Sequence, residues 1–315
     1  REIARQISEA TRRHLQDYTA QLKVEHRALG AYEAEFAAAT LNGVVESEDF
    51  NVVVPSAAAV NSVATITPIK LSANSYTAYS SMMKNYWVKW ADEVDGVVMA
   101  GFQTGKTIPE VTNAILEQMD LSKSGTTKSV LDRARRSAKQ LAITGNNHYA
   151  NTARIAFVDK NDKILKGYRF LAVNDSRTSR TCARLDQTTY AKDDPKLSSV
   201  TPPLHQNCRS ALTFDVDDRF KLDASETKKA SSFEVDGRRD GKPVDSDSIY
   251  YGNLKKLKAR DQDAAIGPTL GKALRRMDAK TFAKMTGDSM NRPLTIKQMK
   301  EKNNELGRIL RAQGK

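Results

Sequence analysis

The spacing of apolar side chains at the start of the chain predicts a long helix. These side chains recur at helical intervals and are Ile3, Ile7, Leu15, Tyr18, Leu22 and Leu29. Residues at this spacing lie on one face of a helix, and no proline or glycine interrupts the run before Gly30. We therefore expect residues 1–42 to form an N-terminal helical segment that packs on another helix or on a neighbouring chain.

The composition changes after this segment. Residues 43–75 are rich in Val, Ala, Ser, Thr and Asn and contain Pro55 and Pro68. This composition predicts an extended linker or an isolated β segment. Helical periodicity returns between residues 76 and 159, in three or four pieces, and is clearest from Lys128 to Tyr149. The basic face of that last piece contacts either solvent or phosphates, and a solvated surface is the simpler interpretation.

Three short segments in the middle of the chain have strand character. They are Ile164–Val173, Thr188–Ala191 and Ser210–Val216. We expect them to form a small antiparallel sheet packed on helices, within a core domain of residues 76–216. The predicted fold class is thus α+β and predominantly helical, with helical N- and C-terminal regions around the small sheet.

One glycine-containing run satisfies a loose phosphate-loop pattern. It extends from Ala100 to Thr107. A phosphate loop follows a buried strand and opens a helix, so that backbone amides converge on the phosphates. The preceding residues make a poor strand, and Pro109 starts the next helix too late. We therefore interpret the run as a joint between two helices.

Rare soft side chains gather in a stretch of about forty residues. The chain has only two cysteines, Cys182 and Cys208, and the second follows His205 closely. Two thiolates and an imidazole suit a structural zinc ion, for which Asp175, His148 or another chain would supply a fourth ligand. Simple packing of two buried thiols is the simpler alternative, and a disulfide also remains open.

Catalysis by this cluster is disfavoured by its surroundings. A catalytic zinc ion needs a general base, and no glutamate lies between Asp175 and Phe214. A Cys-His nucleophile would need an oxyanion hole and a third orienting group, and no local pattern indicates either. We expect no catalytic residues and a protein that is not an enzyme.

The same stretch resembles the phage Mu F-like minor head protein family. The resemblance rests on the runs Asn174–Thr178, Cys182–Asp186 and Pro202–Arg209, which keep the order of the family pattern. Weaker similarity extends from about residue 78 to residue 298. Two positions depart from the pattern: Ser179 stands where many members have the first cysteine, and Gln187 stands where they have a glycine.

The resemblance implies a low-copy structural virion protein. Such a protein associates with the portal or the inner capsid wall and with packaged DNA during head assembly, and a role in DNA ejection is left open. It would lie inside the phage head, after assembly in the host cytoplasm. Three charged residues of the signature, Asp175, Arg177 and Arg209, are expected to fix turns by charge-assisted hydrogen bonds rather than to react. Asp186 belongs to the same structural signature.

Charge is concentrated at the end of the chain. Residues 251–315 contain 16 Lys and Arg against 6 Asp and Glu, so this basic helical tail carries almost all of the net charge of +12. An acidic linker, residues 217–250, precedes it. The cations expected to bind a partner are Lys255, Lys256, Lys258, Arg260, Lys272, Arg275, Arg276 and Lys280. Nonspecific contact with double-stranded DNA and docking on an acidic protein such as a portal ring fit equally well.

The composition also narrows the function classes. The chain has no apolar run of the roughly eighteen residues that a transmembrane helix needs, so we expect no membrane partner. Two cysteines in 315 residues argue against a disulfide-built secreted scaffold. The alternatives to a minor head protein are a metal- or cysteine-dependent nuclease or hydrolase built on the central cluster, and an effector delivered with the genome.

Overall fold

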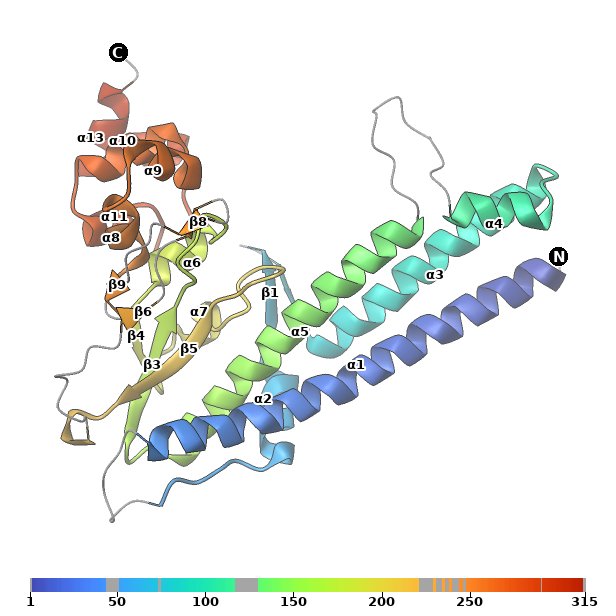
Figure 1. Ribbon diagram of the computed structural model, residues 1–315, viewed down its shortest axis with the longest axis horizontal. Coiled ribbons are helices and arrows are strands. Elements are labelled where there is room, and N and C mark those ends of the chain that lie inside the picture. Colours follow the sequence, from blue (N-terminus) through green and yellow to red (C-terminus); the bar gives the residue numbers. More distant parts are fainter. Residues whose placement is uncertain are drawn as a thin grey trace.

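The chain forms a long helical arm, a small sheet at the base of the arm, and a cluster of short helices beyond the sheet (Figure 1). The first residues lie at the far tip of the arm, and the C-terminus lies at the outer end of the helical cluster. The computed structural model describes residues 2–43, 51–72, 75–116, 130–220, 229–230, 234–235, 238–239, 244–245, 248–289 and 291–313.

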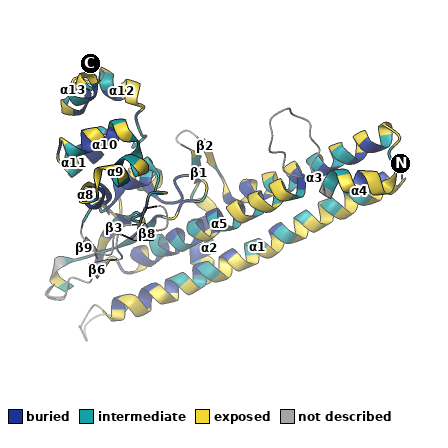
Figure 2. Ribbon diagram, turned by 45° about the horizontal axis from the view of Figure 1, so that its top comes forward, coloured by how far each residue is buried: buried dark blue, intermediate teal, exposed yellow. Residues whose placement is uncertain are grey.

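Three helices make the arm. They are α1 (Glu2–Asn42), α3 (Tyr79–Gln103) and α5 (Val130–Lys160), and each packs on the other two. Buried positions follow the faces where the helices meet (Figure 2), as expected for amphipathic helices. The predicted N-terminal helix is therefore confirmed.

The run that resembles a phosphate loop lies where α3 turns into α4 (Ile108–Leu116). Gly105 has a φ of +72°, which glycine adopts without strain. Gly101 lies inside α3, where an added Cβ would come within 2.6 Å of Val111 on α4. The helix-turn-helix interpretation is confirmed.

The prediction of an extended segment between residues 43 and 75 was wrong in part. Helix α2 (Ala57–Ile66) occupies the middle of this range, and Ser56 caps it by accepting a hydrogen bond of 3.2 Å from the Ala59 amide. Val60 and Ala64 are buried where α2 packs on α1 and α5. These contacts stabilise a helix too short to form alone. A two-stranded antiparallel ribbon follows, β1 (Ile69–Ser72) and β2 (Ser75–Thr77).

The three predicted strands form one antiparallel sheet in the order β4-β3-β5. Their bounds are Leu165–Leu171 for β3, Thr189–Ala191 for β4 and Ala211–Val216 for β5. Helices α6 (Arg180–Leu185) and α7 (Leu197–Val200) lie in the connections. Tyr168 and Phe170 of β3 are fully buried in a core that includes Phe157 of α5 and both cysteines. The sheet therefore holds the signature stretch against the base of the arm.

Six short helices form the C-terminal cluster. They are α8 (Tyr250–Lys255), α9 (Ala259–Ile266), α10 (Pro268–Arg275), α11 (Ala279–Met285), α12 (Ile296–Glu301) and α13 (Glu305–Ala312). Their core contains Tyr251, Leu274 and Phe282, together with Ala183 from α6. The predicted helical tail is thus packed directly on the signature helix.

The predicted acidic linker, residues 217–250, lies largely outside the described residues. Within it the structure gives η1 and four two-residue strands, which pair as β6 with β9 and β7 with β8. Their bounds are Asp218–Phe220, Lys229–Ala230, Glu234–Val235, Arg238–Arg239 and Val244–Asp245.

Two histidines are fully buried in the arm. His26 Nδ1 lies 2.7 Å from the Tyr79 hydroxyl, and His148 Nε2 lies 2.7 Å from the Ala64 carbonyl oxygen. Burial lowers the pKa of each imidazole to about 4. An unfolded histidine has a pKa near 6.5, so the unfolded chain takes up protons first as the pH falls. Both histidines therefore contribute stability that is complete above pH ~6.5 and is lost as the pH falls toward ~4.

Replacing His148 with glutamine is expected to flatten this pH dependence. Each buried histidine contributes a slope of up to about 1.4 kcal/mol per pH unit, so the variant should lose that amount of slope between pH ~4.5 and ~6. Urea unfolding at several pH values measures it. His14→Gln, at an exposed position on α1, is the control and should leave the slope unchanged. Equal slopes in His148→Gln and the parent protein would contradict the explanation.

Candidate functional site

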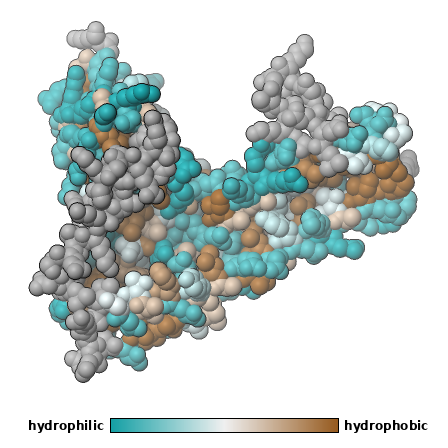
Figure 3. Space-filling view, viewed as in Figure 1, coloured by the Kyte–Doolittle hydropathy of each residue, from teal (hydrophilic) through white to brown (hydrophobic). Residues whose placement is uncertain are grey.

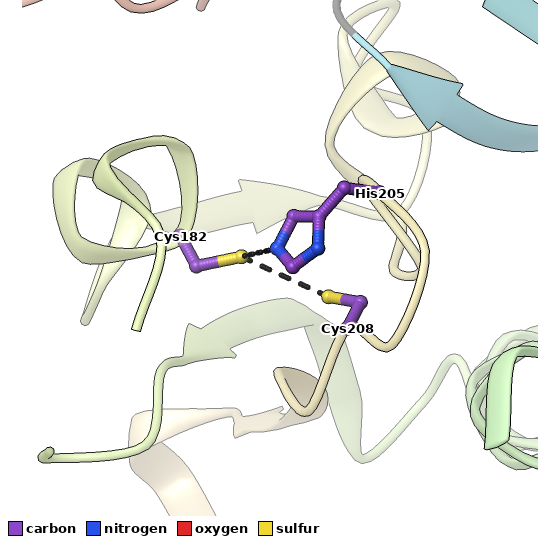
Figure 4. A group of neighbouring side chains, drawn as sticks. All are labelled: Cys182, His205 and Cys208. Atoms are coloured by element: carbon purple, nitrogen blue, oxygen red, sulfur yellow. Dashed lines mark hydrogen bonds between the residues drawn. The ribbon is translucent and has the colours of Figure 1, made fainter. Parts of the chain in front are cut away.

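The two cysteines and the histidine of the signature meet beside the sheet (Figure 4). Cys182 lies in the first turn of α6, and the loop before β5 brings His205 and Cys208 to it. Cys182 Sγ lies 3.3 Å from His205 Nε2 and 3.7 Å from Cys208 Sγ. The three ligand atoms all lie within 4.8 Å of one another, so the structure brings together the three residues that the sequence singled out.

Both sulfur atoms are inaccessible to solvent-borne molecules. Cys182 is 2% exposed and Cys208 is 0% exposed, whereas His205 is half-buried. The hydrogen bond with Cys208, together with burial, raises the pKa of Cys182. The contacts with Cys182 and His205 lower the pKa of Cys208, and Cys208 in turn raises the pKa of His205. The two thiols therefore differ, with the pKa of Cys182 raised and that of Cys208, which contacts His205, lowered.

Ser179 lies next to the Cys-His-Cys group. Its hydroxyl lies 2.9 Å from His205 Nε2 and also caps α6 by accepting a hydrogen bond of 3.3 Å from the Cys182 amide. Ser179 occupies the position at which many members of the phage Mu F-like family, which this stretch resembles, have a cysteine. The sequence comparison marked Ser179 only as a departure, and the structure shows that the departure falls inside the cluster.

The structure does not bring Asp175 into the Cys-His-Cys group as a fourth ligand. Its two carboxylate oxygens accept hydrogen bonds of 2.6 and 2.7 Å from the Arg209 guanidinium, and one also accepts from the Arg177 amide at 3.0 Å. Although burial acts to raise it, the Arg209 contacts lower the pKa of Asp175 below its ordinary value. His148, the other candidate, is buried against α2. Asp175 and Arg209 thus fix the turn before α6.

Asp186 connects the signature to the C-terminal cluster. Its carboxylate accepts hydrogen bonds from the Ala172 amide at 2.8 Å and from the Tyr250 amide at 2.7 Å. The Tyr250 hydroxyl donates to the Asp175 carbonyl oxygen at 3.0 Å. Burial raises the pKa of Asp186 to about 6. Sequence reasoning missed Tyr250, because its partners are 64 and 75 residues away and no local pattern indicates them.

The predicted partner-binding cations divide into two groups. Lys255 donates to the Met277 carbonyl oxygen at 2.6 Å, and Arg275 forms an ion pair of 2.9 Å with Asp263. The other six are exposed, and none forms an ion pair with another described residue: Lys256, Lys258, Arg260, Lys272, Arg276 and Lys280. Hydrophilic side chains cover much of the outer part of the C-terminal cluster (Figure 3).

Comparison with known families bears on this region directly. The family model described as phage Mu protein F like protein matches residues 92–213. The matched segment runs from α3 to β5 and contains the whole Cys-His-Cys group. This central region is similar to the phage Mu F-like family. The family indicates a phage head-related protein and, with it, a location in the virion.

The other comparisons add no relative. No curated protein and no solved structure matches the chain significantly. Among the described helices, none is long and apolar enough to cross a membrane.

The residues of the cluster fit a structural zinc ion in part. Cys182, Cys208 and His205 are ligand types that zinc prefers, and cysteine binds zinc as the thiolate. Ser179 supplies a weaker hydroxyl where a fourth thiolate would complete a closed tetrahedral site. Bound zinc would cross-link α6 to the loop before β5 and so stabilise the fold.

Replacing Ser179 with cysteine is expected to complete this site. The variant should bind zinc more tightly than the parent protein by on the order of tenfold or more, because a thiolate then stands beside His205. Competition with a chromogenic chelator measures the affinity. Ser199→Cys on α7 adds a thiol away from the cluster and serves as the control. Equal affinities for Ser179→Cys and Ser199→Cys would exclude Ser179 from the ligand sphere.

The second departure from the family pattern, Gln187, also has a structural reason. Gln187 has a φ of +62°, in the left-handed region that glycine adopts freely and other residues adopt at a cost.

Gln187→Gly is therefore expected to raise the free energy of unfolding by about 0.5 to 1 kcal/mol. Chemical denaturation measures the change. Asn207→Gly, at a φ of +58°, should gain less because asparagine tolerates this region. A loss of stability in Gln187→Gly would contradict the argument.

Proposed function

We propose that this chain is a low-copy structural component of the phage head, bound to the portal or the inner capsid wall and to packaged DNA. It acts by position during head assembly and catalyses no reaction. The observation that carries the proposal is the use of the signature residues: the thiols are buried, and Asp175 and Asp186 are bound to Arg209 and to backbone amides. Residues engaged in this way stabilise a fold.

The C-terminal cluster supplies the partner contact in this proposal. The six exposed cations predicted to bind a partner can meet phosphate oxygens or acidic side chains, and nonspecific contact with the DNA backbone is the form that clustered Lys and Arg favour. The long arm is well suited to reach a second protein, since it extends away from this basic cluster (Figure 1). One end would then contact DNA while the other contacts the portal or the capsid.

Co-sedimentation with portal rings of the same phage tests the portal contact. The full chain should move with the rings at a fixed ratio below one chain per portal subunit. A variant that lacks the exposed C-terminal cations should still co-sediment if the arm makes the contact. Loss of co-sedimentation in that variant would show that the basic surface contacts the portal instead of DNA. Failure of the full chain to co-sediment with the rings would contradict the proposal.

An enzyme built on the central cluster is the alternative, and one observation favours it. A cysteine beside a histidine is the arrangement of cysteine nucleophiles, and here the contact with His205 lowers the pKa of Cys208. The complete burial of Cys208 argues against it, because a substrate cannot reach the sulfur. Cys208→Ser separates the two functions. An enzyme would lose turnover and keep its fold, whereas a structural cluster would lose stability with no activity to lose.

A further inference from the structure

A cavity of about 310 Å³ lies between the turn after α6 and helix α11, outside the Cys-His-Cys group. Its walls include Arg184, Gln187, Tyr190, Lys280, Lys284 and Asn291. Three of these residues are cations and come from two elements far apart in the sequence. Lys280 and Lys284 are one turn apart on α11 and are exposed at the rim, while Arg184 reaches in from the signature helix.

Arg184 lacks a counter-ion in this cavity. Its Nε donates to the Ala283 carbonyl oxygen at 3.0 Å, but its Nη1 is buried and has no hydrogen-bond partner. Among the described residues no carboxylate pairs with Arg184, since the nearby Asp288 binds Arg292 at 2.6 Å. A partly desolvated guanidinium without an ion pair is costly, and an anion in the cavity would offset that cost.

The one carboxylate in the cavity wall does not supply that anion. Asp186 lines the cavity, but its two oxygens accept hydrogen bonds from the Ala172 and Tyr250 amides. Three cations against one carboxylate leave the cavity with a net positive charge at neutral pH.

We propose that this cavity binds a phosphate group, with Arg184 supplying positive charge from the inner wall and Lys280 and Lys284 binding from the rim. Phosphate has several terminal oxygens, so it can accept from cations that approach from different directions, and an arginine fork suits it well. A single carboxylate has only two oxygens in one plane and matches this arrangement less well. The cavity is also roomy enough for a phosphate with its ester substituents.

The proposal stands apart from the head assignment, because phosphate binding can be measured without a virion. Inorganic phosphate is titrated into the full chain at low ionic strength by isothermal calorimetry. Lys280→Gln with Lys284→Gln should weaken phosphate binding by at least about tenfold, since two of three cations are lost. Lys297→Gln, an exposed cation on α12 outside the cavity, is the matched control and should change affinity less than twofold.

Arg184→Lys provides a second test that keeps the charge. It should also weaken phosphate binding, because lysine cannot both donate to Ala283 and reach the cavity with a second nitrogen. Circular dichroism establishes that this variant folds. Unchanged affinity in a folded Arg184→Lys would overturn the role of the Arg184 guanidinium.

A second arm identifies the source of the phosphate. If the double lysine variant weakens binding of a DNA duplex in parallel, and the duplex competes with phosphate, the group belongs to a nucleic acid backbone. If duplex binding is unchanged while phosphate binding falls, the ligand is a small phosphate compound. Absence of phosphate binding to the parent protein at millimolar concentration would overturn the proposal. Equal loss in Lys297→Gln, or glutarate binding as tightly as phosphate, would overturn it as well.

Discussion

Raising the salt concentration from about 50 to about 200 mM is expected to weaken binding of the full chain to duplex DNA by roughly a thousandfold. The six exposed cations predicted to bind a partner form no ion pairs with other described residues, and each cation that neutralises a phosphate adds about 0.9 to the slope of log affinity against log salt. Fluorescence anisotropy at several salt concentrations measures this slope.

The slope also distinguishes the two basic surfaces of the molecule. Replacing Lys256, Lys258 and Arg260 with glutamine should reduce it by about 2.7. A matched triple substitution of Arg135, Arg136 and Lys139 on α5 should leave the slope unchanged. In this account those exposed side chains contact solvent and do not bind DNA. A loss of slope in the α5 variant alone would move the DNA contact to the arm and contradict the assignment to the C-terminal cluster.

Replacing Arg209 with alanine is expected to lower the free energy of unfolding by about 3 kcal/mol or more. Asp175 is only 5% exposed and both of its carboxylate oxygens are bound by this one guanidinium. Removal of Arg209 leaves a buried charge with weaker partners, which costs more than the pair itself contributes. Urea denaturation at pH ~7 measures the loss under conditions where an unfolded aspartate is ionised.

Arg177 offers the control for this prediction. Its guanidinium also lies near Asp175, at 3.6 Å, but its side chain is 77% exposed. Arg177→Ala should therefore change the free energy of unfolding by less than about 1 kcal/mol, as an exposed ion pair does. Similar losses in Arg177→Ala and Arg209→Ala would show that the hydrogen bonds from Arg209 to the buried Asp175 carboxylate are not what stabilises the turn.

The sequence predicted the parts of the fold that have strong local patterns. The long N-terminal helix follows from a sustained apolar stripe, and the three strands follow from short β-rich segments between turns. It did not predict α2, because a run of Ala, Val, Ser and Asn has no clear polar face. Helix α2 instead depends on burial of Val60 and Ala64 against α1 and α5.

The candidate site divides in the same way. Cys182, His205 and Cys208 could be grouped from the sequence because their residue types are rare in this chain. The partner of Asp175 could not, since Arg209 is 34 residues away and the two residues meet only through the sheet. The contacts of Asp186 and Arg184 with the C-terminal cluster could not be predicted either, because each joins residues at least 64 positions apart in the sequence.

Quantitative mass spectrometry of purified virions tests the central claim most directly. This chain is counted against the portal subunit in intact particles and in particles emptied of DNA. A structural head component should appear in intact particles at a fixed ratio below one chain per portal subunit. Its retention after emptying would indicate a portal or capsid anchor, and its loss would indicate ejection with the DNA. Absence from intact particles would contradict the proposed function.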